Sequence, residues 1–395
     1  MIENLIDKLE NLIKTLDLEN YSNPYLEILL IPNWTKEEIG KDYYASFKNH
    51  FQLEENDYIF QNQGGETHLT SVVQLADFSI ALGIKNGAEK GIKKISQYLE
   101  SDTITAYELM LLPAVHLQTE FKFSNGVKLI FPNSIPHKFI ADKLKNEYAY
   151  GYAPSLRINS ALILKGTQSK FLGKRDDNHN FEKDKIDLNP LYDALYCLSL
   201  CRPIESGIQP YAISLISNEE LPFWRSNDRW RFLPYKKPPS FHSEISNQEF
   251  ENADKLLKLI RKLPTSLKNK LTISLDKLND FGSGLEMVDR AINLRICLES
   301  IFLNDGNKEQ LRFTLALRGS LYLGESYERR KEIFQTLKKA YDITSTAVHE
   351  GIFKVENEPI LNQAAEIAKE AIIKIIENGK ILNWNEIELG KGANE

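Results

Sequence analysis

The stretch from residue 246 to the end constrains the fold most, because six segments with apolar residues at helical spacing follow one another there. Residues three, four and seven apart share one face of a helix, so each segment carries an apolar stripe that must pack against a neighbour. The links between segments are short and polar, and contain Gly or Asn. Short links favour antiparallel neighbours. The sequence therefore predicts an all-α antiparallel helical bundle over residues 246–395.

Residues 1–245 show a mixed pattern that predicts an α+β region. The clearest strand signal is the alternation on both sides of Asn125-Gly126, because Asn-Gly accepts the positive φ angles of a tight hairpin turn. Residues 167–185 are polar and charged, which predicts a surface loop. Further strands are expected at 25–32, 155–166 and 210–217, and helices at 4–16, 70–85 and 87–99.

Charge and cysteine content exclude several classes of protein. The net charge is −6, so any nucleic-acid site must be a local basic patch on an acidic body. Cys197 and Cys201 would share a helix face, but the chain lacks the second ligand pair of a structural zinc site. No run approaches the ~20 apolar residues that span a bilayer. We expect a cytoplasmic protein that uses no metal or cofactor and no membrane.

The junction at residues 223–240 is one candidate for RNA binding. Arginines and lysines alternate there with Trp224, Trp230 and Tyr235. Guanidinium groups bind phosphates and aromatic rings stack on bases, so this composition suits single-stranded RNA. The alternative is that the aromatic side chains pack a domain junction while the charges stay in water.

A second candidate is the helix expected over residues 326–351. Ile333, Phe334, Leu337, Ala340 and Tyr341 recur at helical spacing and should face the core. The same spacing puts the polar residues on a different face of the helix; they are Asp342, Ser345, Thr346 and His349. An imidazole with a pKa near neutrality can take and return a proton. The alternative is a solvated helix end, where a cationic His349 is favoured by the C-terminal carbonyls.

Residues 285–379 resemble a HEPN domain of the ApeA-like group found in bacterial defence proteins. The resemblance covers about a quarter of the chain and rests on AINLRICLESIFL, LALRGSLYL and RRKEIFQTLKKAYDITSTAVHEG. Glu299 matches a glutamate of the family's first helix. The family's last motif is matched here by Tyr341, Ser345, His349 and Gly351. The resemblance implies a paired, homodimeric domain with metal-independent endoribonuclease chemistry, in which His349 handles the protons. It also implies that residues 1–245 form a sensing or recognition domain.

The sequence departs from the family's pattern in two ways, because Glu350 is inserted before Gly351 and the motif Arg is missing. HEPN ribonucleases place an Arg, then four to six residues, then the His; the allowed positions here are Thr344, Ile343 and Asp342, and none is Arg. An Arg directed at developing charge is worth about 3–4 kcal/mol, by analogy with removal of one oxyanion-hole donor, and Thr344 cannot supply that charge. Another cation has to replace it. The candidates for binding RNA are Arg295, which is spaced i,i+4 from Glu299, and Arg318, Arg329 and Arg330.

Three functions follow from these observations. The first is an RNA-directed anti-phage defence protein whose HEPN-type dimer cleaves RNA, tRNA among the expected substrates, with His349, Ser345 and Glu299 as catalytic candidates. The second is a non-catalytic HEPN protein that binds RNA, a nucleotide or a protein partner as a dimeric scaffold. The third is a structural dimer in which His349 only closes a helix. Loss of the motif Arg favours the second function over cleavage.

Overall fold

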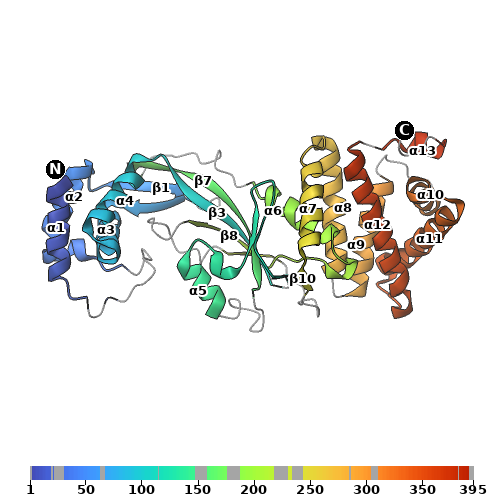
Figure 1. Cartoon of the computed structure of the whole chain (residues 1–395), viewed down its shortest axis with the longest axis horizontal. Coiled ribbons are helices and arrows are strands. Elements are labelled where there is room, and N and C mark those ends of the chain that lie inside the picture. The colour runs from blue at the N-terminus through green and yellow to red at the C-terminus, as the bar shows by residue number, and fades with distance from the viewer. Residues whose placement is uncertain are drawn as a thin grey trace.

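The structure is a computed structural model, and it describes a defined part of the chain. The described residues are 2–18, 21, 31–62, 67–113, 115–146, 158–175, 187–217, 230–233, 243–283, 286–303, 310–380 and 382–390. The molecule is elongated (Figure 1), with the first helices at one end, a curled antiparallel sheet in the middle and a helical region at the other end. The N-terminal region is therefore α+β and the C-terminal region is helical, as predicted.

The N-terminal helices pack together on one face of the sheet. They are α1 (Ile2–Thr15), α2 (Lys41–Phe51), α3 (Val72–Asn86) and α4 (Ala88–Glu100), with short 3-10 turns at Trp34–Lys36 and Glu38–Gly40. Their buried side chains form one core cluster with Ile104 and Ala106 of the sheet. On the other face of the sheet lies α5 (Lys138–Asn146), which packs against Leu109 and Leu111.

Eight strands of the described residues form the curled sheet, in which every pairing is antiparallel. The main strand order is β2-β1-β7-β3-β8-β9. These strands are β1 (Asp57–Asn62), β2 (Thr67–Ser71), β3 (Thr103–Leu112), β7 (Ser160–Lys174), β8 (Ala212–Ser217) and β9 (Arg231–Phe232). Off this path, β5 (Phe121–Lys122) pairs with β6 (Lys128–Ile130), and β6 pairs with β7. A separate parallel pair joins β4 (Val115–Leu117) to β10 (Ser243–Ile245).

The hairpin predicted at Asn125-Gly126 is confirmed, and Gly126 has the expected positive φ of 91°. The surface loop predicted at 167–185 is wrong for its first part, because β7 continues to Lys174. Gln168 and Lys170 are buried there although they are polar, and the strand pairs with both β3 and β1. Residues 176–185 of that loop, and most of the strand expected at 25–32, lie outside the described residues.

The C-terminal helices match the six predicted segments. They are α7 (Asn247–Ile260), α8 (Thr265–Ser283), α9 (Met287–Phe302), α10 (Leu311–Leu323), α11 (Tyr327–Glu350) and α12 (Glu358–Asn378), followed by the short α13 (Trp384–Glu388). Gly351 and Gly379 end α11 and α12 in the left-handed conformation, which residues other than glycine rarely adopt. The expected C-cap at Gly379 is therefore confirmed.

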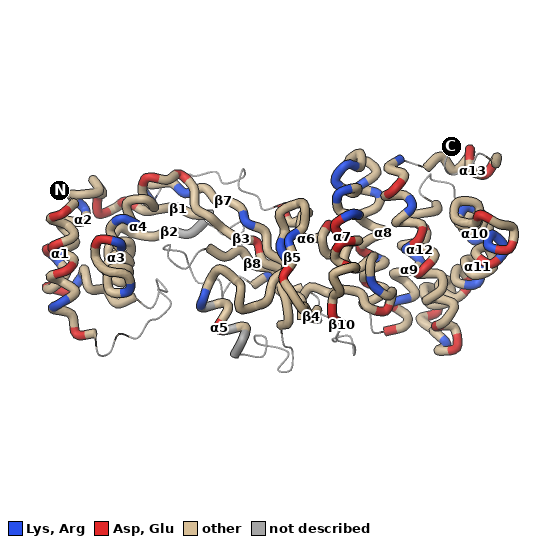
Figure 2. The backbone as a smooth tube through the Cα atoms, viewed as in Figure 1, with Lys and Arg blue, Asp and Glu red and all other residues tan. Residues whose placement is uncertain are grey.

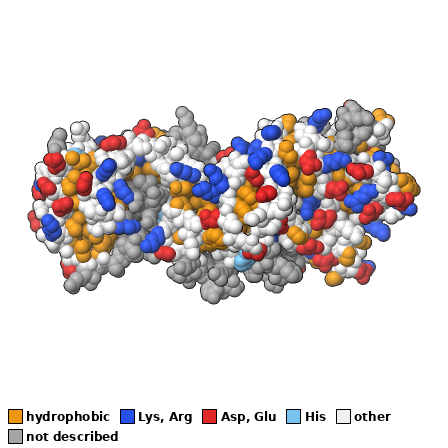
Figure 3. Space-filling view, in the orientation of Figure 1, with side chains coloured by type: hydrophobic (Ala, Val, Ile, Leu, Met, Phe, Trp, Pro, Cys, Tyr) orange, Lys and Arg blue, Asp and Glu red, His pale blue; other side chains and the backbone are white. Residues whose placement is uncertain are grey.

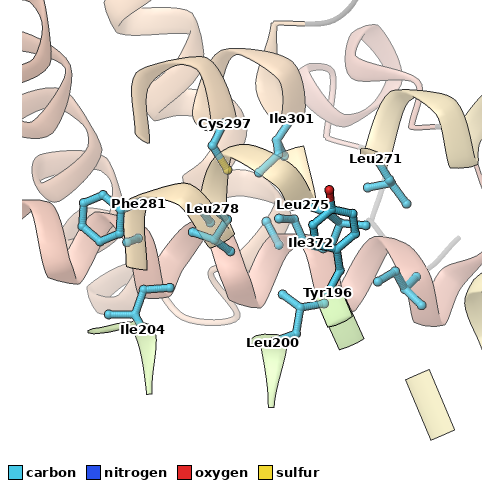
Figure 4. Close-up of a cluster of buried hydrophobic side chains, with 14 of the residues drawn as sticks. Tyr196, Leu200, Ile204, Leu271, Leu275, Leu278, Phe281, Cys297, Ile301 and Ile372 are labelled. Atoms are coloured by element: carbon cyan, nitrogen blue, oxygen red, sulfur yellow. The ribbon is translucent and has the colours of Figure 1, made fainter. Parts of the chain in front are cut away.

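The helix α6 (Asn189–Leu200) joins the sheet to the helical region. Figure 4 shows Tyr196 and Leu200 of α6 among apolar side chains of α8, α9 and α12. The same core cluster extends to Met110 and Leu112 of β3. The apolar core is thus continuous on both sides of residue 245, where the sequence predicts a domain boundary; the division itself stays a prediction.

Candidate functional site

The polar face predicted for α11 is present. Tyr341, Ser345 and His349 are spaced i,i+4 and form one ridge along the helix. The ridge runs outward from the core, since Tyr341 is buried, Ser345 is half-buried and His349 is exposed. His349 lies in the last turn of α11, directly before Glu350 and the capping Gly351. Its imidazole is therefore open to solvent and to a binding partner.

At the inner end of this ridge, α9 contributes two side chains to a polar cluster. Arg295 donates from Nε to Glu299 Oε1 (2.9 Å) and from Nη2 to the Tyr341 hydroxyl (2.8 Å). The guanidinium also lies 4.4 Å from the centre of the Tyr341 ring, within the range of a cation–π contact. Burial raises the pKa of the Tyr341 hydroxyl, with Arg295 opposing the shift and Glu299 adding to it. We call Arg295, Glu299 and Tyr341 the α9–α11 cluster.

One guanidinium nitrogen of this cluster has unused hydrogen-bonding capacity. Arg295 Nη1 is buried and donates to no acceptor in the described part of the chain. The side chain as a whole is 15% exposed and Glu299 is 34% exposed, so the cluster opens to solvent on one side. An uncompensated buried donor costs free energy, and an incoming oxygen acceptor such as a phosphate would remove that cost.

Thr344, one of the three positions allowed for the motif Arg, does not belong to this face. Thr344 is 1% exposed, and its hydroxyl donates to the carbonyl of Tyr341 (3.1 Å). Thr344 and His349 are five residues apart, which places them about 140° apart around a helix with 3.6 residues per turn. A side chain at 344 therefore points into the helical core, while His349 points to solvent.

Arg318, one of the cations expected to replace the motif Arg, is buried. Its side chain is 1% exposed and lies inside the helical region. It donates to Glu388 Oε1 (2.6 Å) and to the carbonyl of Phe302 (2.8 Å), and its guanidinium lies 5.4 Å from the Trp384 ring. Arg318 thus joins α10 to α9 and α13, and it is not exposed for contact with RNA.

Arg329 and Arg330 lie at the opposite end of α11 from His349. Twenty residues separate Arg329 from His349, which is about 30 Å of helix. Arg329 binds Glu332 and Glu370, both at 2.9 Å, and Arg330 donates to the carbonyl of Gly324 (2.8 Å). Glu205 and Glu366 line the same groove as Arg329. That groove is acidic and disfavours phosphate.

Arg312 is a further basic residue that contacts α11 beside the α9–α11 cluster, and the sequence pattern did not single it out. Arg312 of α10 forms an exposed ion pair with Asp342, next to Tyr341 (2.9 Å). Helical spacing could have distinguished the exposed Arg312 from the buried Arg318. Arg318 lies three residues after Leu315 and four residues before Tyr322, so it falls within the buried stripe of α10. Acidic and basic residues are otherwise interspersed along these helices (Figure 2), and their side chains are intermixed over the helical region in Figure 3.

The junction at 223–240 falls mostly outside the described residues, including Trp224 and Tyr235. Trp230 packs partly buried against the core near α5, and Arg231 is exposed on β9. Cys197 is fully buried, and burial raises the pKa of the Cys201 thiol to about 11. Across the described ranges, no three His, Cys, Asp or Glu side chains gather as metal ligands.

Comparisons with known proteins leave the family open. No family model, no curated protein and no solved structure matches the chain. Among the helices that the structure describes, none is long and apolar enough to cross a lipid bilayer.

Proposed function

We propose that this chain is an RNA-directed protein of prokaryotic antiviral defence, with a HEPN-like helical region that binds RNA at the α9–α11 cluster. One observation carries the proposal. Glu299 and Tyr341, which the resemblance to HEPN domains singles out from distant parts of the sequence, both contact the guanidinium of Arg295. That guanidinium lies over the ring of Tyr341, at the inner end of the ridge that carries Ser345 and His349, and its Nη1 has no acceptor among the described residues.

RNA binding is favoured over cleavage by a single chain. Tyr341 and His349 are eight residues apart, or about 12 Å along α11. Among the described contacts, none joins a cation to His349, and Thr344, the allowed position of the motif Arg nearest to His349, faces the core. Metal-independent cleavage needs a proton-transferring group and a cation at one phosphate. In one copy, His349 and the guanidinium of Arg295 lie apart. The proposed cleavage therefore requires HEPN-like pairing of two copies, which would bring a cation of the second copy to His349.

The binding proposal is tested by titrating labelled tRNA into wild-type protein and the Arg295→Ala variant at several salt concentrations. We expect the variant to bind about tenfold more weakly, with the slope of log K against log salt reduced by about one. Arg329→Ala is the matched control, since it also removes one guanidinium from the helical region but from an acidic groove. It should bind as wild type does. Equal binding by Arg295→Ala, or no RNA binding by wild type, would contradict the proposal.

Cleavage is tested separately with total tRNA in EDTA, which removes metal-dependent contaminants. The comparison is wild type against His349→Ala, with circular dichroism to check that the variant folds. Loss of cleavage in the variant alone would establish a nuclease centred on His349. Binding without cleavage by either protein would support the non-catalytic scaffold. Growth arrest on expression that His349→Ala relieves would give the same distinction in cells.

A further inference from the structure

A pocket lies where the sheet region meets the helical region, away from the α9–α11 cluster. Its volume is about 250 Å³. One wall is α6, which presents Tyr192 and Tyr196, and the facing wall is α8, which presents Asp276 and Asp280. Both pairs are spaced i,i+4, so each pair forms one ridge on its helix. A ridge of two aromatic rings therefore faces a ridge of two carboxylates.

The pocket is held open by fixed backbone rather than by loose side chains. Asn279 of α8 donates to the carbonyl of Ile208 (2.8 Å) and accepts from its N–H (3.0 Å). Gly207 and Gly282 allow the two backbones to approach closely, since a Cβ on Gly207 would lie 2.5 Å from the nitrogen of Ser283. Segment 207–210 is thereby fixed against α8, and its last residues, with Leu233, form the third wall.

The charges at the pocket leave one carboxylate oxygen open. Lys277 Nζ lies 3.0 Å from a carboxylate oxygen of both Asp276 and Asp280, and the Tyr196 hydroxyl donates to the second oxygen of Asp276 (3.1 Å). Asp280 Oδ1 has no hydrogen bond within the described part of the chain. One lysine balances one of two carboxylates, so the acidic ridge keeps a net negative charge. None of the described side chains that line the pocket is Lys or Arg.

We propose that this pocket binds a small organic cation, an amine or guanidine whose charged end meets Asp280 and whose body lies against the tyrosine rings. The rings of Tyr192 and Tyr196 lie 5.9 Å apart and are tilted by 33°, which offers two adjacent faces for cation–π contact. Asp280 supplies a charge-assisted hydrogen bond. A phosphate ester is disfavoured, because the described lining residues include two carboxylates that repel it and no Lys or Arg. The ligand would contact both α6 and α8, and so would link the sheet region to the helical region.

The test uses the full chain and agmatine, which carries a guanidinium and an ammonium group, in isothermal titration calorimetry and thermal unfolding. We expect agmatine to bind and to raise the midpoint of unfolding. Asp280→Asn should weaken binding by about tenfold or more, since a charge-assisted hydrogen bond is lost. Lys277 can still pair with Asp276 in this variant, so the fold should be retained. Tyr192→Leu should also weaken binding, because it removes one aromatic face.

Asp42→Asn is the matched control. It removes the same charge from another lysine-paired carboxylate (Lys8, 2.9 Å) on the N-terminal helices. If Asp42→Asn weakens agmatine binding as much as Asp280→Asn does, the cation is attracted only by the net charge of the protein, and the proposal fails. Absence of binding to wild type would also overturn it. Binding of guanosine in place of agmatine, lost in Tyr192→Leu, would show that the pocket accepts a base and would overturn the assignment to a cation.

Discussion

At the scale of single residues, burial decides what each arginine of the helical region can do. Arg318 and Arg312 both lie on α10, six residues apart. Arg318 is enclosed and its donors are directed at protein acceptors, whereas Arg312 forms an ion pair with Asp342 in which both side chains are about half exposed. A buried charge that loses its partner is costly, while an exposed ion pair contributes little.

Replacement of Arg318 by alanine should therefore lower the free energy of unfolding by about 3 kcal/mol or more, since it removes the contacts of α10 with Glu388, Phe302 and Trp384 and leaves a cavity. Arg312→Ala should change it by less than about 1 kcal/mol. Urea denaturation followed by circular dichroism measures both. Equal stabilities would mean that Arg318 is not part of the packed core.

Introducing the motif arginine of HEPN ribonucleases by Thr344→Arg should destabilise the protein rather than create a nuclease. The side chain at 344 points into the core, so a guanidinium there is buried without a partner, at a cost of about 3 kcal/mol or more. Thr344→Val keeps the shape, removes one hydrogen bond to Tyr341 and should cost only about 1 kcal/mol. Denaturation and tRNA cleavage in EDTA are the measurements. A stable, cleaving Thr344→Arg variant would contradict this account.

Sequence spacing could predict part of the candidate site, and its limits have a physical cause. The 3.6-residue period correctly separated Ile333, Leu337 and Ala340 from the polar face that carries His349. The pairing of Arg295 with Tyr341 could not be predicted in this way, because it depends on how α9 and α11 pack. Periodicity describes one helix at a time and contains no information on which residues of two helices meet.

At the scale of elements, most helices with one apolar stripe were predicted, but the helices α2 and α5 and some strands were not. The six C-terminal helices and the turn at Gly126 follow from local patterns. By contrast β3, which is central in the sheet, was missed. Its last four residues, Leu109–Leu112, are all buried, since both faces of the strand are covered there. Such a strand shows no alternation of polar and apolar residues, so it has no period-two signal.

The start of α7 offers a test of local determinants. Ser246 accepts a hydrogen bond from the N–H of Glu249, and the Glu249 side chain accepts from the N–H of Ser246, so the two form a capping box. Ser246→Ala should lower the free energy of unfolding by about 1 kcal/mol. Glu249→Gln preserves a capping-box acceptor and should cost less. The same loss in both variants would show that the negative charge of Glu249 stabilises α7 as much as the serine cap does.

At the scale of the whole molecule, two apolar clusters meet along one face of β3. Ile104 and Ala106 belong to the N-terminal cluster, and Met110 and Leu112 belong to the cluster shared with the helical region. Glu108 lies between them on the same face, opposite Leu164 and Leu215. Its Oε2 accepts no hydrogen bond from residues in the described ranges. A carboxyl group is thus held between two apolar clusters at the centre of the chain.

This carboxyl group should make the stability of the whole chain depend on pH. Burial raises the pKa of Glu108 from about 4.5 to about 7, and the charge of Asp187 adds to the shift. Between pH 4.5 and pH 7 the folded protein binds more protons than the unfolded chain. The contribution of Glu108 to the free energy of unfolding is therefore complete below pH 4.5 and is lost as the pH rises through 7. Glu108→Gln is neutral at every pH and cannot lose it.

The difference in unfolding midpoint between Glu108→Gln and wild type should therefore be small near pH 4.5, grow towards pH 7 and stay constant above it. Thermal unfolding of both proteins at a series of pH values measures this difference directly, and titrations common to both cancel. Glu251→Gln, on the exposed face of α7, removes the same charge and should show no such rise. A Glu108→Gln curve parallel to wild type across the whole range would mean that Glu108 is already ionised and solvated in the folded protein.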